Sequence, residues 1–131
     1  MIENLLNNAP QILILVFLIV TFLQSGIDKI MDWKGNLEFI SGHFKNSPLA
    51  NFVPALLGII TVMEILAGVL MLLGIFQLAT SGETLLSFFG LIISAKTLIF
   101  LLIGQRLAKD YAGAMSLAVY FILTVFGLYI L

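Results

Sequence analysis

Four long stretches of apolar residues, nearly free of charge, constrain this chain more than any other feature. The first is free of charge from residue 4 to residue 27 and the fourth contains no charge, while the second and the third each contain a single charged side chain near the middle. About 20 consecutive apolar residues suffice for a transmembrane helix, so the pattern predicts an all-α polytopic membrane protein. The four expected transmembrane helices cover about residues 10–31, 51–77, 84–104 and 111–131.

The connections between these stretches predict a compact bundle. Residues 78–83 and 105–110 are short loops, so the second, third and fourth helices should be antiparallel neighbours. The chain has no internal repeat and no low-complexity segment. We therefore expect a single domain over residues 1–131, built as a four-transmembrane-helix bundle.

The composition excludes several classes of protein. Charged residues make up 10% of the chain, against about 25% in soluble domains, so a soluble fold is excluded. The net charge of −1 provides no basic surface for nucleic acid. The absence of cysteine excludes a dithiol relay, a thiolate-bound iron–sulfur cluster and a cysteine zinc site, and a single histidine cannot form a bis-histidine haem. No metal site or resident cofactor is expected.

Residues 32–50 form the only substantial segment between predicted transmembrane helices. Apolar and polar side chains alternate there at helical spacing, and the apolar face carries Trp33 and Phe44. Asp32 is a candidate cap for this amphipathic helix, and Gly42 should interrupt it. Such a helix lies in the headgroup plane of a membrane, or it packs as a lid on the end of the bundle. Both placements are compatible with the sequence.

Basic residues predict the orientation in the membrane. All of those outside the apolar stretches fall in the first and third loops or at their borders, and none lies in the second loop or at the termini. The positive-inside rule then places loops 1 and 3 in the cytoplasm and both termini outside. We expect an integral protein of the bacterial inner membrane. These basic residues are Lys29, Lys34, Lys45, Arg106 and Lys109.

The two charges inside the apolar stretches, Glu64 and Lys96, require an explanation. An ionisable group in a transmembrane helix costs about 2.5–3.5 kcal/mol on insertion scales. Counted from the cytoplasmic ends of the predicted helices, Glu64 lies roughly 20 Å deep and Lys96 roughly 12 Å deep. A lysine side chain can span that difference, so the sequence predicts an ion pair between Glu64 and Lys96 if their helix faces agree.

Other polar side chains fall near the same depth and suggest a buried cluster on the bundle axis. The candidate ligand-binding residues are Gln24, Ser25, Glu64, Lys96 and Tyr120. Two interpretations are open. The charged pair can be architectural, because it fixes which helices pack together, or the cluster can bind a ligand or carry a proton. His43, beside Phe44, is interpreted as a solvated interface residue rather than a metal ligand.

Several short motifs resemble the DoxX-like family of small four-helix membrane proteins. The segment from Ser25 to Lys29 resembles the SGxxK signature of that family. Glu64, Gly68 and Gly74 resemble its second helix. The segments 104–106 and 110–113 fit the end of its third helix and the start of its fourth. The resemblance implies a compact bundle with a polar interior. Many members have an arginine early in the first helix, where this chain has Gln11.

The resemblance implies function only loosely. DoxX-like proteins have been associated with quinone-coupled oxidation of sulfur compounds, with redox-stress complexes and with assembly of other membrane proteins. We expect a non-catalytic accessory subunit that anchors, assembles or stabilises a membrane complex, with a redox complex among the options. The alternative is a quinone- or lipid-binding subunit of an oxidoreductase. Without a catalytic motif, the chain is at most a quinone-reactive subunit.

The expected partners are the lipid bilayer and other membrane-protein subunits, with a homo-oligomer as a further option and nucleic acid excluded. A small transporter or proton path ranks last, because the sequence contains no pair of glycine-broken helices of the kind that line transport sites.

Overall fold

The computed structural model describes all residues 1–131 and is entirely helical. Four helices are long and apolar enough to cross a membrane, which confirms the predicted all-α bundle. The second of them runs four residues further than predicted, because nothing stops it before Gly82, whose positive φ of 75° closes the helix. The four are α2 (Ala9–Met31), α4 (Val53–Ser81), α5 (Leu85–Leu107) and α6 (Tyr111–Ile130).

Three short elements complete the chain. Helix α1 (Ile2–Asn7) was not predicted, and the Asn4 side chain holds it to the end of α4 by donating to the Ala79 carbonyl at 3.2 Å. Helix α3 (Trp33–His43) confirms the helix expected within residues 32–50, with Asp32 accepting a hydrogen bond from the Gly35 amide. Its location at the membrane surface stays a prediction. A 3-10 turn, η1 (Ala50–Phe52), leads into α4.

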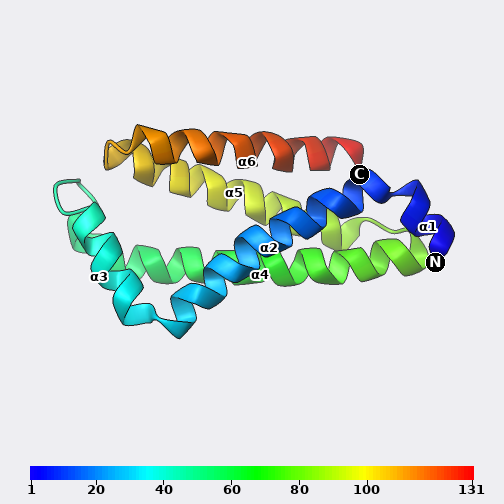
Figure 1. Ribbon diagram of the computed structural model, residues 1–131, viewed down its shortest axis with the longest axis horizontal. Coiled ribbons are helices and arrows are strands. Elements are labelled where there is room, and N and C mark those ends of the chain that lie inside the picture. The colour runs from blue at the N-terminus through cyan, green and yellow to red at the C-terminus, as the bar shows by residue number, and fades with distance from the viewer.

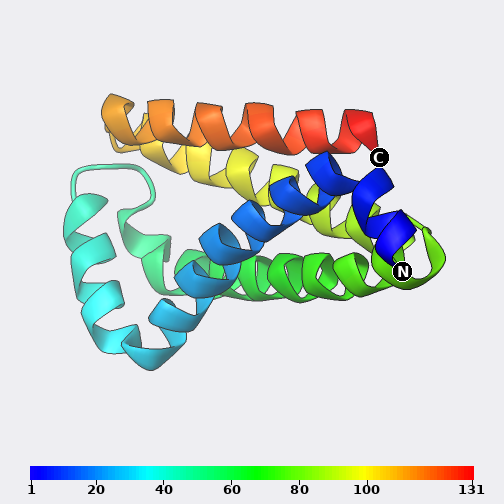
Figure 2. The same cartoon turned by 45° about the vertical axis from the view of Figure 1, so that its right-hand side comes forward.

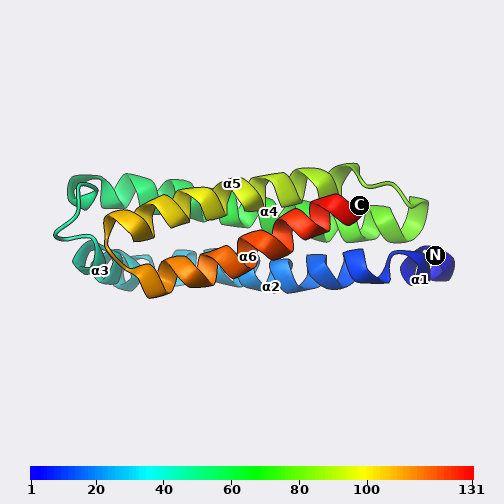
Figure 3. The same cartoon turned by 90° about the horizontal axis from the view of Figure 1, so that it is seen from above.

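The long helices form an antiparallel bundle that is tight at one end and wide at the other. Figures 1 and 2 show α4, α5 and α6 running side by side, while α2 begins beside the end of α6 and moves away from it toward α3. At the tight end, Gln11 Nε2 donates to the Ile130 carbonyl at 2.8 Å. At the wide end, α3 lies across the bundle. Figure 3, seen from above, shows α5 and α6 slanting together relative to α2 and α4.

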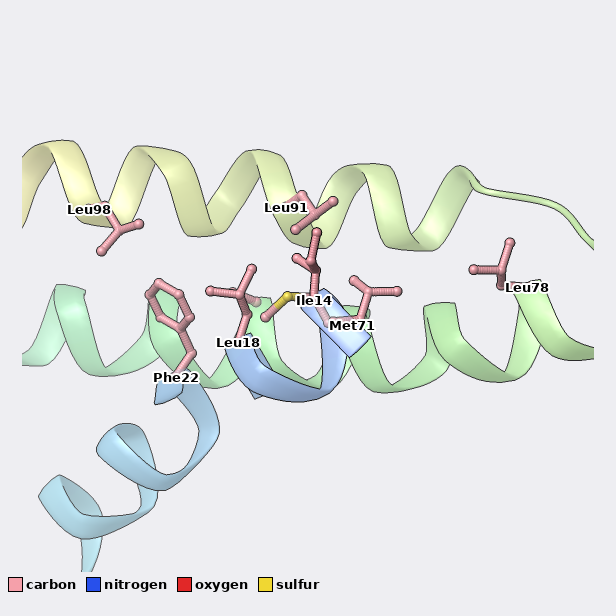
Figure 4. Packing of buried hydrophobic residues seen from close by; sticks show 9 residues of the cluster. Ile14, Leu18, Phe22, Met71, Leu78, Leu91 and Leu98 are labelled. Atoms are coloured by element: carbon pink, nitrogen blue, oxygen red, sulfur yellow. The ribbon is translucent and has the colours of Figure 1, made fainter. Parts of the chain in front are cut away.

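The apolar core fills the tight half of the bundle. Figure 4 shows that its side chains come from one face each of α2, α4 and α5. Phe22 is the last core residue of α2, and the next turn of that helix carries polar side chains. The labelled residues are Ile14, Leu18, Phe22, Met71, Leu78, Leu91 and Leu98.

Small residues bring α4 and α5 into close contact. A Cβ atom added to Gly74 would lie 2.7 Å from the Ser87 amide nitrogen, and one added to Gly90 would lie 2.9 Å from the Met71 amide nitrogen. Such close backbone approach is typical of transmembrane helix pairs. It fixes which face of α5 is turned toward α4, and therefore which face is turned outward.

Candidate functional site

The interior of the bundle contains one buried ion pair, at the start of its wide half. Glu64, on the inner face of α4, is only 4% exposed. The Lys29 Nζ atom, on α2, lies 2.8 Å from Glu64 Oε1. The contact does not have hydrogen-bond geometry, so this buried carboxylate oxygen accepts no hydrogen bond. A buried charge is tolerated when it is paired, and Lys29 supplies the pairing.

Ser25 holds the lysine in place from within the same helix. Lys29 Nζ donates to Ser25 Oγ at 2.6 Å, because residues four apart share one face of a helix. Between them, Gly26 lets α4 approach α2, since a Cβ atom there would lie 2.6 Å from the tip of Ile65. The SGxxK motif therefore combines a helix contact at its glycine with a serine-bound lysine that faces Glu64.

A cavity of about 710 Å³ extends from this ion pair toward α3. It lies where α2 has diverged from α6, and all five helices from α2 to α6 contribute to its wall. Of its 20 lining residues 13 are hydrophobic, so the space suits a molecule that is mostly apolar. A hollow at the opposite end of the bundle, around Gly82 and Leu85, has only exposed Glu83 as an ionisable side chain. The cavity beside α3 is therefore the candidate site.

A second polar group faces the same cavity from its α3 side. His43 Nε2 lies 2.8 Å from Gln105 Oε1 and 3.6 Å from Asp110 Oδ2. Asp110 also caps α6, by accepting a hydrogen bond from the Gly113 amide. The His43 ring lies nearly parallel to the Phe39 ring and nearly perpendicular to the Phe44 ring. These contacts join the end of α3 to the last turn of α5 and to the N-cap of α6, so α3 closes the end of the cavity.

The structure brings together only part of the cluster that the sequence predicted. Ser25 and Glu64 both line the cavity. Gln24 and Lys96 are exposed on the outer surface, and Tyr120 is half-buried against Phe17 outside the cavity lining. No group of three or more His, Cys, Asp or Glu side chains is arranged to hold a metal ion.

The predicted ion pair between Glu64 and Lys96 is wrong. Both residues lie eleven positions from the same end of the bundle, about 16 Å along their helices, so their depths differ less than the sequence predicted and depth does not separate them. Their helix faces differ, however. The small residues of α5 that contact α4 include Ser94, and Lys96, two residues on, is turned about 200° away from it. Packing of the small face against α4 places Lys96 outside.

Sequence reasoning missed two parts of the site. Lys29 contributed to the predicted orientation and to the family motif but not to the predicted site, although its four-residue spacing from Ser25 indicated a shared helix face. His43 was interpreted as solvated, although Gln105 and Asp110 occur in the motifs quoted for the family. What no local pattern showed was that α3 turns back and places His43 beside them.

A comparison with protein families agrees with this architecture. The family model described as DoxX matches residues 12–104. The chain belongs to the DoxX family. The match covers most of α2, all of α3 and α4 and most of α5, and so includes the ion pair. No curated protein and no solved structure matches the chain. It is thus a DoxX-family integral membrane protein with four transmembrane helices.

Proposed function

We propose that this DoxX-family protein binds a lipophilic small molecule with a polar head group, a quinone or a lipid, in the cavity beside α3. The observation that carries the proposal is the combination of a largely apolar space of about 710 Å³ with a buried ion pair at its inner end. Ligand sites typically combine an apolar wall with a few polar groups that orient the ligand.

The polar groups offer both donors and acceptors to such a head group. The Ser25 hydroxyl accepts from Lys29, which leaves its own O–H free to donate to a quinone or ester carbonyl. Glu64 lines the cavity, and its carboxylate can accept a hydrogen bond from a ligand hydroxyl. A quinone fits this donor and acceptor set. When bound it would supply two-electron chemistry, and these residues would hold its head group.

The cavity opens toward lipid. Its lining residues Phe39, Ile59, Phe100 and Ile103 are each half exposed or more. Three of them lie on the transmembrane helices α4 and α5, and Phe39 lies on α3, which we expect at the membrane border. A lipophilic ligand can therefore enter from the bilayer without crossing water.

Two neighbouring leucines on α5 provide the test. Leu101 lines the cavity, whereas Leu102 does not and is partly exposed. We would extract lipids from the purified protein, identify them by chromatography, and measure binding of decylubiquinone by calorimetry. Leu101→Trp should lower bound quinone or lipid and weaken decylubiquinone binding, while Leu102→Trp should leave both unchanged. Equal behaviour of the two variants would refute a ligand in this cavity.

A different observation favours a second function. The chain would act as a non-catalytic subunit that anchors or assembles a larger membrane complex. Lys96 is exposed on the outer face of α5 instead of lying in the bundle, and lipid provides no partner for it. Co-purification of this chain with one complex in stoichiometric amounts, in a mild detergent, tests this function. A chain that always purifies alone would argue against it.

A further inference from the structure

Lys96 lies at the midpoint of a transmembrane helix, on its outer surface. Eleven residues separate it from each end of α5, about 16 Å of helix in either direction. That distance exceeds the length of a lysine side chain, so the ammonium group cannot reach the headgroup region from the middle of the span. The isolated chain therefore exposes a cation to hydrocarbon.

Nothing in the chain neutralises this cation. Lys96 forms no ion pair, and the residues three, four and seven positions away on its helix are all apolar. Most of these neighbours are themselves exposed, so they form an apolar face of α5 around the charge. We name this surface the Lys96 face. It consists of Phe89, Ile92, Ile93, Lys96, Ile99, Phe100 and Ile103.

We propose that the Lys96 face binds a transmembrane helix of another membrane protein, and that this helix has an aspartate or glutamate near its middle. Charged residues within a membrane almost always pair with one another or face a protein interior. A carboxylate at the same depth would pair with the ammonium group, and the apolar neighbours would pack against the partner helix. The proposal rests on the subunit role, and it names the chemistry of the partner and its position.

A second copy of this chain does not satisfy that requirement. A two-fold contact through this face would place one Lys96 beside another, which is repulsive. The only acidic residues in the four long helices are Asp28, three positions before the end of α2, and Glu64. Glu64 is buried and already paired with Lys29. No exposed acid is therefore available at the required depth, and the partner must be a different protein.

A designed peptide tests the proposal without a known partner. The probe is a leucine-rich transmembrane peptide of about 23 residues, the length of α5, with a glutamate at its middle position. The reference peptide has leucine there. Because the chain lacks cysteine, a single cysteine at Ala108 can carry a fluorophore for energy transfer in liposomes. We expect the glutamate peptide to bind about 5- to 30-fold more tightly than the leucine peptide.

Variants of the protein identify the source of that preference. Lys96→Met should abolish it, Lys96→Arg should keep it, and Lys109→Met, which removes an exposed cation outside the span, should not change it. Exchanging the charges, with Lys96→Glu and a lysine-containing peptide, should restore tight binding. Equal binding of the two peptides to the wild type, or a preference that survives Lys96→Met, would overturn the proposal.

The subunit role can be judged separately from this site. If the chain co-purifies with a membrane complex and Lys96→Met leaves that association intact, the subunit role stands and the Lys96 face is not its contact surface. If Lys96→Met abolishes the association and Lys109→Met does not, the result supports both the subunit role and the Lys96 face as its contact surface. Because removal of a lipid-exposed charge does not disturb any contact within the bundle, Lys96→Met should still fold.

Discussion

The ion pair between Lys29 and Glu64 predicts a distinctive pattern in a double-mutant cycle. Removing one member of a buried pair costs about 3–5 kcal/mol, whereas replacing both by apolar residues is often nearly neutral. Lys29→Met should fall near the lower end of that range, at about 3 kcal/mol, because it leaves the buried Glu64 carboxylate without a cation. Glu64→Met should cost less, because the Lys29 side chain is already 16% exposed and lies two residues before the end of α2.

The quantity that this cycle measures is the coupling energy between Lys29 and Glu64. The loss of unfolding free energy in the double variant should be smaller than the sum of the single losses by about 1–3 kcal/mol. Glu64→Gln should be milder than Glu64→Met, because the amide oxygen still lies beside the ammonium group. Unfolding free energy can be measured in detergent by far-UV circular dichroism as dodecyl sulfate is added.

A second cycle with Lys96 provides the control. Lys96 has no ion-pair partner within the chain and is exposed on α5. Lys96→Met should therefore not destabilise the isolated protein, and its effect should add to that of Glu64→Met within about 0.5 kcal/mol. Coupling between Glu64 and Lys96, together with additivity between Glu64 and Lys29, would refute the structural assignment of the pair.

Three further predictions concern packing, topology and the loop helix. Gly74→Ala should lower stability by about 1–3 kcal/mol, because its Cβ would meet the Ser87 backbone, whereas Gly58→Ala, whose nearest neighbour is the Trp33 ring at 3.8 Å, should be tolerated. Equal thermal unfolding temperatures for the two variants would contradict this packing. A cysteine at position 34 should be shielded from an impermeant outside label and one at position 82 should react; the reverse would overturn the predicted orientation. Trp33 is only 37% exposed, so its fluorescence should be blue-shifted and poorly quenched by iodide, and a spectrum of fully hydrated tryptophan would contradict its placement.

The transmembrane helices could be predicted from the sequence because their cause is local. A stretch of apolar residues without charge can be stable only in a membrane or a core, and its length sets the number of crossings. The ends were less predictable. Helix α4 continues past Gln77 to Ser81, since polar residues near a membrane border stop a helix only where the backbone is forced to turn, as it is at Gly82.

The face of each helix was harder to predict than the depth of its charges. For α5 the relevant signal was present, because Ser87, Gly90, Ser94 and Thr97 recur at three- and four-residue spacing and are all buried. That stripe competes with the expectation that two opposite charges should meet when a lysine side chain can span the difference in their depths. The stripe determines which face of α5 is turned toward α4, because close packing of whole helices involves many contacts. The Glu64 charge can instead be paired by another residue.

Lys29 illustrates the part of the site that local reasoning could not resolve. It lies two residues before the end of α2, where a lysine can extend into the headgroup region or turn inward. The choice depends on Glu64, which is 35 positions away in the sequence and on another helix. Only the crossing of α2 over α4, which Gly26 and Gly68 allow, brings the two side chains together.

Glu64 and Lys96 lie at equal depth but belong to two different surfaces of the protein. Glu64 faces inward and is neutralised within the chain, so it belongs to the cavity, whereas Lys96 faces outward and can be neutralised only by another molecule. The two surfaces nevertheless meet. Phe100 and Ile103 belong to the Lys96 face and also line the cavity where it opens. A partner helix bound to the Lys96 face would therefore lie against that opening, where it would be in position to cover a ligand in the cavity or to exchange one with it.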